Sequence, residues 1–506
     1  MLVATGPQIK QADHIQIHER HVPGIVLMEQ AAGGATQEIL KQYPDQQTFL
    51  ILAGPGNNGG DGLVIARHLH LAGKDVQIIL SHDPARYQGD AEINYRIIGE
   101  LPIPINPFGQ DAPSEVLSSF PTPPLLIDAL LGFGVTEPLR GSILELVQFF
   151  RKTSLPTVAI DLPSGLNANT GETINPVIRA EHTITFQLPK VCHVVTPAML
   201  ECGQVHVHDI GIWPEVIEEL GIQRRTITGE WISQQIPLRP TAGHKGTFGH
   251  VLVIGGSRQM AGAPILTASA AIRAGAGLCT ALVPESCRLP FYSHVPEAMC
   301  LTSRSSDEHL TPDDARLMDQ HLSGKSAIAL GPGMGTHPDT RKFLAEALPM
   351  IQVPLILDAD GLNILSQMPE LWAMLPEQTI LTPHPGEMRR LTGLENVNAR
   401  RMESAERLAQ DRQVTVLLKG AGTIIAHPDG RTHINTTGNP GMATGGSGDV
   451  LSGVIAALAA GGMGTMEAAS AGAFFHGQAG DRAATQLGQA HISAMDLISQ
   501  LRTDCG

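Results

Sequence analysis

The chain repeats one pattern along its whole length: a short run of Val, Ile and Leu ends in Gly or Asp and is followed by a segment with helical periodicity. A strand that is apolar at every position is buried on both faces, which is typical of a parallel sheet covered by helices on each side. The runs in the first part of the chain span residues 48–54, 75–80, 125–130, 157–161, 182–186 and 204–212. Those in the second part span residues 249–257, 277–283, 326–331, 354–360, 379–384 and 414–420. The pattern predicts an α/β fold, with helices over residues 62–71 and from about residue 448.

The strand pattern stops between residues 213 and 242 and then starts again. A chain of 506 residues is long enough for two to four domains of about 100–200 residues each. No period of about 20–50 residues repeats, which argues against solenoids and propellers. We therefore expect two tandem three-layer α/β/α domains that divide near Ile222, at residues 1–222 and 223–506.

Charge and composition exclude several classes of protein. The formal net charge is -15, so no basic surface is expected for the phosphate backbone of a nucleic acid or for an anionic membrane. Apolar residues make up 42% and charged residues 16% of the chain, which excludes a disordered protein. The cysteines include no CxxC pair, the apolar run at 454–460 is far shorter than a membrane span of roughly 18 residues, and residues 1–11 lack a signal-peptide core. We expect a cytoplasmic protein that binds small ligands.

The first glycine-rich loop, GPGNNGGDG at residues 54–62, follows the first predicted strand and opens a helix. Parallel sheets bind anionic ligands at this position, because the loop exposes backbone N–H groups at a helix N-terminus. Its glycines match GxGxxG, but Pro55, the Asn57-Asn58 pair and Asp61 depart from the fingerprint of a dehydrogenase. The alternative is a tight strand-to-helix turn rich in Gly and Asn.

Two more predicted strands of the first domain end in polar residues. Asp128 ends one strand, and Asp161 ends the next and is followed by Ser164. The carboxyl ends of parallel strands meet at one edge, so these side chains are expected near Asn58. Asn58, Asp128 and Ser164 offer oxygen ligands with one carboxylate, which suits a monovalent hard cation better than zinc. Asp161 is a candidate proton shuttle, unless it and Ser164 only cap a turn.

The second glycine-rich loop, NTTGNPGMATGGSGDVLSG at residues 435–453, leads into a predicted helix. Its glycines and the helix N-terminus can hold a phosphate group. Asp449 would repel phosphate as a ligand but can deprotonate an attacking hydroxyl, which indicates phosphoryl transfer. The alternative is a glycine-rich hairpin in which Asp449 caps the helix.

Other polar residues in the second domain leave two interpretations open. His384 lies between two prolines, so a stiff backbone can aim its ring at a ligand, or the ring can belong to an exposed turn. Asp358 and Asp360 can hold magnesium, or can alternate along a strand and face different layers.

Two histidines of the first domain are candidate zinc ligands. His206 and His208 share one strand face beside Asp209. Without a third ligand at a suitable spacing, we do not expect zinc there.

Three segments of the first domain resemble the NAD(P)H-hydrate epimerase family over roughly the first 215 residues: GPGNNGGDG, LIDALLGFGVTEPLRG and AIDLPSGLNANTG. The resemblance implies a Rossmann-like domain in which potassium is held by Asn58, Asp128 and Ser164, and in which Asp161 contacts the substrate and moves protons. It implies that the hydrated dinucleotide is bound by Asn57, Asn58, Gly59, Gly60, Asp61, Gly132, Phe133, Gly134, Val135, Thr136, Glu137 and Pro138. Non-catalytic scaffolds of this fold, including one of messenger-RNA decapping, are expected to lose these polar residues, which are all present here.

The second domain contains GGSGD, which resembles the GxGD anion hole of ribokinase-like kinases. The segments MAGAPILTASAAIRAGAGL, GPGMG, LDADGLN, LTPHPGEM and KGAGT are similar to those of NAD(P)H-hydrate dehydratase. The resemblance implies that Ala263, Gly333, His384 and Asp449 touch the hydrated dinucleotide. It implies that the adenine nucleotide is held by Lys419, Gly420, Ala421, Gly422, Thr423 and Gly448. Ser447 stands where Thr is expected in many relatives and keeps the hydroxyl.

Together the two resemblances imply a repair enzyme for NADH and NADPH that have taken up water at C6 of the nicotinamide ring. One domain would interconvert the R and S epimers, and the other would dehydrate the S epimer with ADP, giving AMP and phosphate. Potassium and magnesium are the expected ions, and a homo-oligomer is the expected assembly. The alternatives are a ribokinase-like small-molecule kinase, a Rossmann dehydrogenase and a non-enzymatic scaffold.

Overall fold

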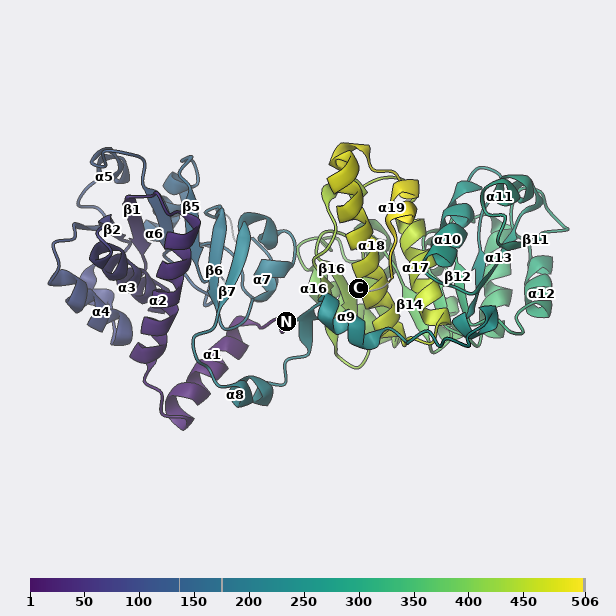
Figure 1. Cartoon of the computed structure of the whole chain (residues 1–506), viewed down its shortest axis with the longest axis horizontal. Helices are drawn as coiled ribbons and strands as arrows, with labels where there is room; N and C mark the ends of the chain where they lie inside the picture. The colour runs from purple at the N-terminus through teal and green to yellow at the C-terminus, as the bar shows by residue number, and fades with distance from the viewer. Residues whose placement is uncertain (136, 174–175, 504–506) are drawn as a thin grey trace. The chain divides into compact units, whose positions relative to one another are not determined.

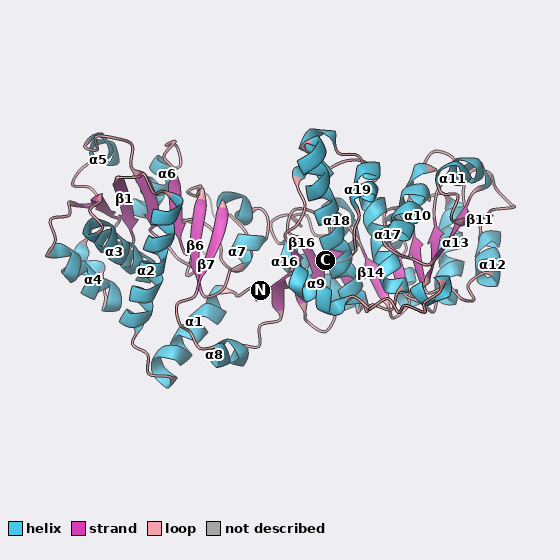
Figure 2. Ribbon diagram, viewed as in Figure 1, coloured by secondary structure: helices cyan, strands magenta, loops and turns pink. Residues whose placement is uncertain are grey.

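The protein is described here by a computed structural model that covers residues 1–135, 137–173 and 176–503. The chain divides into two compact units, residues 1–224 and residues 225–506. Each unit is built around one sheet with helices on both faces (Figures 1 and 2).

The sheet of the first unit has seven strands in the order β3-β2-β1-β4-β5-β6-β7. All of its pairs are parallel. The strands are β1 (Thr48–Ala53), β2 (Asp75–Leu80), β3 (Ile105–Pro107), β4 (Leu125–Ala129), β5 (Thr157–Ile160), β6 (His182–Phe186) and β7 (Gln204–His208). The strand order reverses between β1 and β4, and ligands bind at such a switch point in open α/β sheets.

Helices cover both faces of this sheet because its strands are apolar on both sides. In β1, Phe49 and Ile51 belong to one buried cluster, whereas Leu50 and Leu52 belong to another. The first cluster includes side chains of α2 and α3, and the second includes side chains of α6. The helices are α1 (Gly6–His14), α2 (Gly24–Gln42), α3 (Asn57–Leu71), α4 (Gly89–Gly99), α5 (Pro113–Ser118), α6 (Gly141–Phe150), α7 (Val191–Val194) and α8 (Pro214–Glu219).

The sheet of the second unit has ten strands in the order β11-β10-β9-β12-β13-β14-β15-β16-β17-β8. It is parallel from β11 to β15, and β16 pairs antiparallel with both β15 and β17. The strands are β8 (Arg224–Thr226), β9 (His250–Ile254), β10 (Leu278–Val283), β11 (Met299–Thr302), β12 (Ala327–Leu330), β13 (Leu355–Leu357), β14 (Thr379–Leu381), β15 (Thr415–Leu418), β16 (Thr423–Ala426) and β17 (Thr432–Asn435).

One buried cluster of the second unit joins the sheet to α10, α17, α18 and α19. A Cβ atom on Gly453 of α17 would lie 2.2 Å from the carbonyl oxygen of Thr267 in α10, so a glycine is needed where these helices touch. α16 also packs on β15 and β16, but its buried side chains lie outside this cluster. The helices are α9 (Gly229–Gln235), α10 (Gly262–Arg273), α11 (Arg288–His294), α12 (Pro312–Gln320), α13 (Pro338–Ala347), α14 (Asp360–Gln367), α15 (Pro385–Thr392), α16 (Arg401–Arg412), α17 (Ser447–Ala460), α18 (Thr465–Leu487) and α19 (Ala494–Gln500).

The α/β fold and the twelve strands expected from the sequence are confirmed, although several strands are shorter than expected. Five short strands were not expected, namely β3, β8, β11, β16 and β17. α3 begins at Asn57 rather than at Gly62, because the segment NNGGDG itself forms the first turns of the helix. Among the helices that the structure describes, none is both long and apolar enough to cross a membrane.

Candidate active sites

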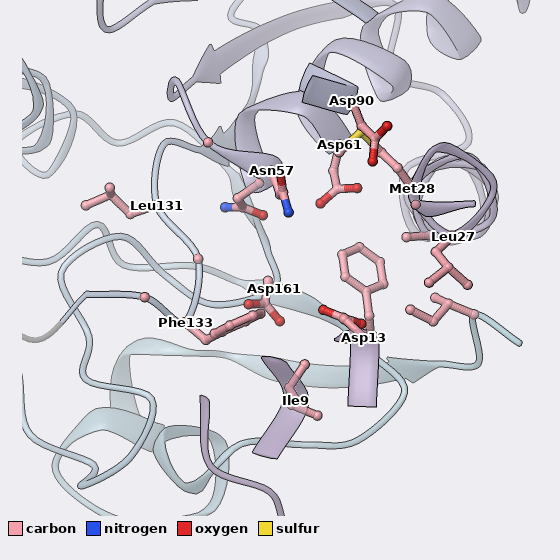
Figure 3. A pocket seen from close by; sticks show the side chains of 18 of the residues that line it. Ile9, Asp13, Leu27, Met28, Asn57, Asp61, Asp90, Leu131, Phe133 and Asp161 are labelled. Atoms are coloured by element: carbon pink, nitrogen blue, oxygen red, sulfur yellow. The ribbon is translucent and has the colours of Figure 1, made fainter. Parts of the chain in front are cut away.

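The first unit has a cavity of about 490 Å³ at the carboxyl ends of its central strands (Figure 3). It is lined by α1 and α2, by the loops that follow β1 and β4, and by residues after β5 and β6. Small-molecule sites have volumes of roughly 300–1,000 Å³. The cavity is therefore large enough to hold much of a dinucleotide.

The glycines of the first loop bring three elements together at the cavity. A Cβ atom on Gly54 would lie 1.8 Å from the carbonyl oxygen of Leu130, and one on Gly59 would lie 1.7 Å from that of Gly54. Only glycine allows the loop to approach the end of β4 and the start of α3 so closely. Asn57, Asn58 and Asp61 of α3 line the cavity, so the positive end of the helix dipole faces it.

Asp161 and Lys190 form a buried ion pair in this cavity. Lys190 Nζ lies 2.6 Å from Asp161 Oδ1, 2.8 Å from Thr185 Oγ1 and 3.1 Å from the carbonyl oxygen of Phe186. These three acceptors match the three protons of the ammonium group. Burial alone would raise the pKa of Asp161, but the charge and hydrogen bond of Lys190 outweigh it and hold that pKa below its ordinary value. Asp161 is therefore ionised, in a left-handed backbone conformation with φ of 64°.

Asp13 and Asp61 are directed into the same hollow as Asp161 (Figure 3). Burial raises the pKa of Asp13 to about 6, although the charge of Lys190 lowers it. Burial raises the pKa of Asp61 well above its ordinary value, and the charge of Asp161 adds to this effect. The cavity thus combines an ionised carboxylate with carboxyl groups that retain their protons more readily, a combination suited to acid–base chemistry.

Asn58, Asp128 and Ser164 lie buried beside the cavity. Asp128 Oδ1 accepts a hydrogen bond from Ser164 Oγ at 2.6 Å, and Asp128 Oδ2 accepts one from the Ser164 N–H at 2.8 Å. Burial raises the pKa of Asp128 to about 6. The amide oxygen and nitrogen of Asn58 are buried and have no hydrogen-bond partner among the described residues. A bound cation would satisfy the Asn58 oxygen and the Asp128 charge, so these oxygens fit a hard monovalent ion.

The segment 132–138 reaches the cavity with its first half. A Cβ atom on Gly132 would lie 3.3 Å from Asp161 Oδ2 and 3.4 Å from Asn58 Cβ. Phe133, Gly134 and Val135 also line the cavity. Glu137 and Pro138 are exposed and do not line it, Gly59 and Gly60 are buried behind it, and Thr136 lies outside the described residues.

Asp449 is in the first turn of α17, within the second glycine-rich segment. Burial raises the pKa of Asp449 to about 7, the charges of Asp358 and Asp360 add to the rise, and that of Lys419 opposes it. A general base works best when its pKa is near the working pH. Asp449 is therefore tuned to accept a proton near neutral pH.

Lys419 lies next to Asp449 and is held by two carboxylates. Its Nζ lies 2.8 Å from Asp358 Oδ1 and 3.7 Å from Glu387 Oε2. A Cβ atom on Gly448 would lie 3.4 Å from the same nitrogen, so the start of α17 touches the Lys419 ammonium group. This arrangement places a fixed positive charge at the N-terminus of α17, where an anion binds most favourably.

Asp358 and Asp360 are engaged by protein donors. Asp358 Oδ2 accepts a hydrogen bond from Ser452 at 2.7 Å, in addition to the ion pair of Oδ1 with Lys419. Asp360 Oδ2 accepts one from the N–H of Gly335 at 2.9 Å. Asp358 is thus used to fix Lys419, and Asp360 ties the loop GPGMG to the start of α14.

Of the other residues expected at the dehydratase site, Ala263 lies in the first turn of α10, Gly333 in the loop after β12, and His384 directly before α15. A Cβ atom on Gly333 would lie 2.9 Å from that of Ala263, so these two residues touch. His384 caps α15, because its Nδ1 accepts hydrogen bonds from the N–H groups of Gly386 and Glu387, and the ring remains half exposed. Burial and the charge of Lys419 lower the pKa of His384.

The segment KGAGT forms the tight connection between β15 and β16. Gly420 and Gly422 have φ of 138° and 64°, conformations that glycine adopts easily. Thr423 Oγ1 donates a hydrogen bond of 2.7 Å to the carbonyl oxygen of Gly420, and Ala421 is exposed at the tip.

Known proteins resemble this chain over nearly its whole length. A family model described as NAD(P)H-hydrate dehydratase matches residues 251–503, and one described as YjeF-related protein N-terminus matches residues 24–192. The bifunctional NAD(P)H-hydrate repair enzyme of Moorella thermoacetica is 39% identical over 511 residues, which cover 99% of this chain and 96% of that relative. The chain belongs to the family of bifunctional NAD(P)H-hydrate repair enzymes.

Other members of the repair-enzyme family are similarly related. The enzyme of Escherichia coli is 35% identical, and the match covers 97% of this chain and 92% of that relative. One similar solved structure is the ADP/ATP-dependent NAD(P)H-hydrate dehydratase of Bacillus subtilis, which was co-crystallised with ATP and Mg²⁺. It is 30% identical to this chain, with a TM-score of 0.47, and the match covers 54% of this chain and 95% of that one. A ribokinase-like superfamily protein of Enterococcus faecalis is also 30% identical, with a TM-score of 0.49 over 55% of this chain and 93% of that one.

His206 and His208 have other partners in this member of the repair-enzyme family. His206 Nε2 lies 2.9 Å from His182 Nδ1, and His206 Nδ1 lies 3.2 Å from Glu38 Oε1. A Cβ atom on Gly34 would lie 1.6 Å from His208 Nε2, so His208 packs closely on α2. Both ring nitrogens of His206 are therefore occupied by protein groups.

Asp13 and Lys190 were missed by the sequence reasoning, although both line the cavity of the first unit. Asp13 lies in α1 near the N-terminus, and Lys190 follows β6, so neither stands in a glycine-rich loop. One signal in the sequence could have found Lys190: it is a lone charge four residues beyond the apolar strand β6, near the predicted ligand edge of the sheet.

Proposed function

We propose that residues 1–222 interconvert the R and S epimers of hydrated NADH and NADPH, and that residues 223–506 dehydrate the S epimer with ADP, giving NADH or NADPH, AMP and phosphate. The observation that carries the second activity is Asp449, a carboxyl group with a pKa of about 7 in the first turn of α17. A base at an anion-binding helix N-terminus is the arrangement that phosphoryl transfer to a hydroxyl group requires.

In the dehydratase reaction, Asp449 takes the proton of the C6 hydroxyl group as that oxygen attacks the terminal phosphorus of ADP. AMP leaves with the electrons of the broken P–O bond. The C6–O bond then breaks as the lone pair of the ring nitrogen forms a C=N bond, and phosphate leaves. Loss of a proton from C5 then forms the C5=C6 double bond and restores the reduced nicotinamide ring. Phosphorylation replaces a poor leaving group by a good one, so the base is needed for the first step.

The ligands are assigned to the loops around Asp449. The hydrated dinucleotide is proposed to contact Ala263, Gly333, His384 and Asp449. ADP is proposed to be held by Lys419, Gly420, Ala421, Gly422, Thr423 and Gly448. Magnesium would enter with the phosphates of ADP, because this ion usually keeps phosphate and water ligands beside one or two carboxylates, and it would neutralise phosphate charge. Asp358 is already ion-paired with Lys419 and Asp449 is assigned as the base, so Asp360 is the carboxylate left for the ion.

In the epimerase reaction, Asp161 would accept a proton from the hydrate while Asp13 or Asp61 donates one. The support is the single cavity that holds all three carboxyl groups, with Lys190 keeping Asp161 ionised. The residues from Asn57 to Asp61 and from Gly132 to Pro138 are proposed to hold the dinucleotide.

The proposed function is tested by mixing the full-length protein with both epimers of hydrated NADH and with ADP, and following the absorbance of the reduced nicotinamide. The absorbance is expected to rise until both epimers are consumed. A kinase of another small molecule or a dehydrogenase would leave the hydrate unchanged. No rise in absorbance would contradict the dehydratase activity.

Potassium is proposed to be held by Asn58, Asp128 and Ser164. Replacing potassium by lithium is expected to slow epimerisation about tenfold or more, because the smaller ion does not fit the same oxygens. Epimerisation is measured as the rate at which the separated R hydrate becomes S, without ADP. Dehydration of the S hydrate by the same sample serves as the control, and equal epimerisation rates in both salts would contradict the site.

The cytoplasm is the proposed location, and a homo-oligomer is the proposed assembly. Cys192, Cys202, Cys279, Cys287 and Cys300 are free thiols, as in proteins of a reducing compartment. Ile93 and Ile97 are exposed one turn apart on α4, where a second copy could cover them. Light scattering of the purified protein measures the assembly.

A further inference from the structure

Two histidines and an aspartate meet on the surface of the second unit, away from the groups used in the proposed mechanism. His309 Nε2 and His337 Nδ1 each lie 3.7 Å from Asp339 Oδ2. The two imidazole rings lie 3.8 Å apart between their centroids. One ligand atom from each residue lies within 4.8 Å of the other two. We call these residues the 309–339 cluster.

Packing of the protein itself holds the 309–339 cluster together. His309 belongs to the loop before α12, whereas His337 and Asp339 start α13. Thr340 of α13 donates a buried hydrogen bond of 3.2 Å to the carbonyl oxygen of Leu310, the residue after His309. The two segments are therefore fixed to each other at the cluster, and little rearrangement is needed for its three side chains to share a ligand.

The spacing of the cluster fits a transition metal. Zinc is bound by His nitrogen and Asp oxygen at about 2.0–2.2 Å in a tetrahedral arrangement, which places neighbouring ligand atoms about 3.4 Å apart. The 3.7 Å separations in the cluster are within a few tenths of an ångström of that value. Imidazole nitrogen favours zinc, nickel, cobalt or copper, whereas magnesium and potassium favour oxygen. We propose that His309, His337 and Asp339 bind a divalent transition-metal ion, with water at the remaining position.

The contacts already made by the cluster allow this binding. His337 Nδ1 accepts a long hydrogen bond of 3.2 Å from the Asp339 N–H, so this nitrogen carries no proton, and a metal would take over its lone pair by replacing that hydrogen bond. Lys342 Nζ lies 3.4 Å from Asp339 Oδ1, the oxygen that does not face the histidines. The side chains of all three cluster residues are partly exposed, so a metal ion can enter from solvent.

A metal at this cluster would act on two loops of the dehydratase site. The loop GPGMG, which contains Gly333, ends two residues before His337. On the other side, Glu308 precedes His309 and binds Arg258, which lies in the loop between β9 and α10. The metal would thus tie the loop before α12 to the start of α13 and limit the motion of both. Binding itself does not depend on the proposed function.

Calorimetric titration of the magnesium-loaded full-length protein with zinc chloride tests the site. We expect one zinc ion per chain to bind at the cluster and to raise the melting temperature of the protein. His309→Ala, His337→Ala and Asp339→Asn are each expected to weaken this binding at least tenfold, because each removes one of three protein ligands. His321→Gln, which changes an exposed histidine at the end of α12, is the matched control and should bind zinc like the unchanged protein.

A second measurement keeps the test independent of variant folding. Crystals of the unchanged protein soaked in zinc should show an anomalous scattering peak between His309, His337 and Asp339. Zinc binding that is equally strong in all three variants, or an anomalous peak located elsewhere, would overturn the proposal. Dehydratase activity in the absence of zinc reports on the folding of each variant, and its failure would concern the proposed function and not the metal site.

Discussion

Asp449→Asn is expected to lower the ADP-dependent recovery of NADH from the S hydrate by about 10²–10⁴-fold, the usual contribution of a general base. The amide cannot accept the proton of the C6 hydroxyl group, so attack on the terminal phosphate loses its base. Epimerisation should be unchanged, because the Asp161 cavity lies in the other unit. Initial rates measured with the separated S hydrate and saturating ADP give the effect directly.

The pH dependence separates a base from a residue that only packs. Burial raises the pKa of Asp449 to about 7, so the rate of the unchanged protein should rise with pH through about 7 as this group ionises. Because burial raises this pKa only in the folded state, the fold loses stability as the pH rises from the ordinary pKa of an aspartate, 3.8, to about 7, and the loss is complete above that pH. Asp449→Asn should therefore melt at the same or a higher temperature above pH 7. Asp319→Asn, on the exposed side of α12, is the matched control. An Asp449→Asn protein that kept its dehydratase activity would contradict the role of Asp449 as the base.

The sequence predicts the sheets well because their strands are continuous apolar runs. β1 reads TFLILA, and all six residues are buried, so its pattern admits no solvated face. The strands that the sequence missed lack this signal: β8 reads RRT with intermediate burial, and β3 reads INP. Such short strands form because a neighbouring strand offers backbone hydrogen bonds, and this partner is not visible in the local sequence.

The sequence predicts the site residues that lie in or beside glycine-rich loops. Gly54, Gly59 and Gly448 stand where a Cβ atom would meet another element, so the site loops are marked by their glycines. Lys190 is different, because its role arises from its contacts with Asp161, which directly follows β5, and with Thr185 in β6. The pKa of Asp13 likewise depends on burial by the cavity walls. Such effects come from the folded surroundings of a residue and have no local pattern.

Lys190→Met is expected to slow epimerisation about 10²-fold or more at neutral pH, because Asp161 loses the charge that keeps it ionised. Without the ammonium group, burial and the nearby Asp13 and Asp61 would raise the pKa of Asp161, so the rate of the variant should recover as the pH is raised. A change that only loosened the fold would not shift the pH profile in this direction. The rate of conversion of the separated R hydrate, measured between pH 6 and pH 9 without ADP, checks both expectations.

Lys190→Met is also expected to be less stable than the unchanged protein. Removing one partner of a buried ion pair costs about 3–5 kcal/mol, because the other charge is left buried and unpaired. The double variant Lys190→Met with Asp161→Asn removes that stranded charge, so it should melt at a higher temperature than Lys190→Met while still lacking epimerase activity. Lys41→Met is the matched control, because Lys41 is exposed and pairs with Glu38 on the surface, where such pairs contribute about 0–1 kcal/mol. Since the dehydratase site lies in the other unit, each variant should still consume the S hydrate. Unchanged epimerisation in Lys190→Met would show that Asp161 works without the Lys190 ammonium group.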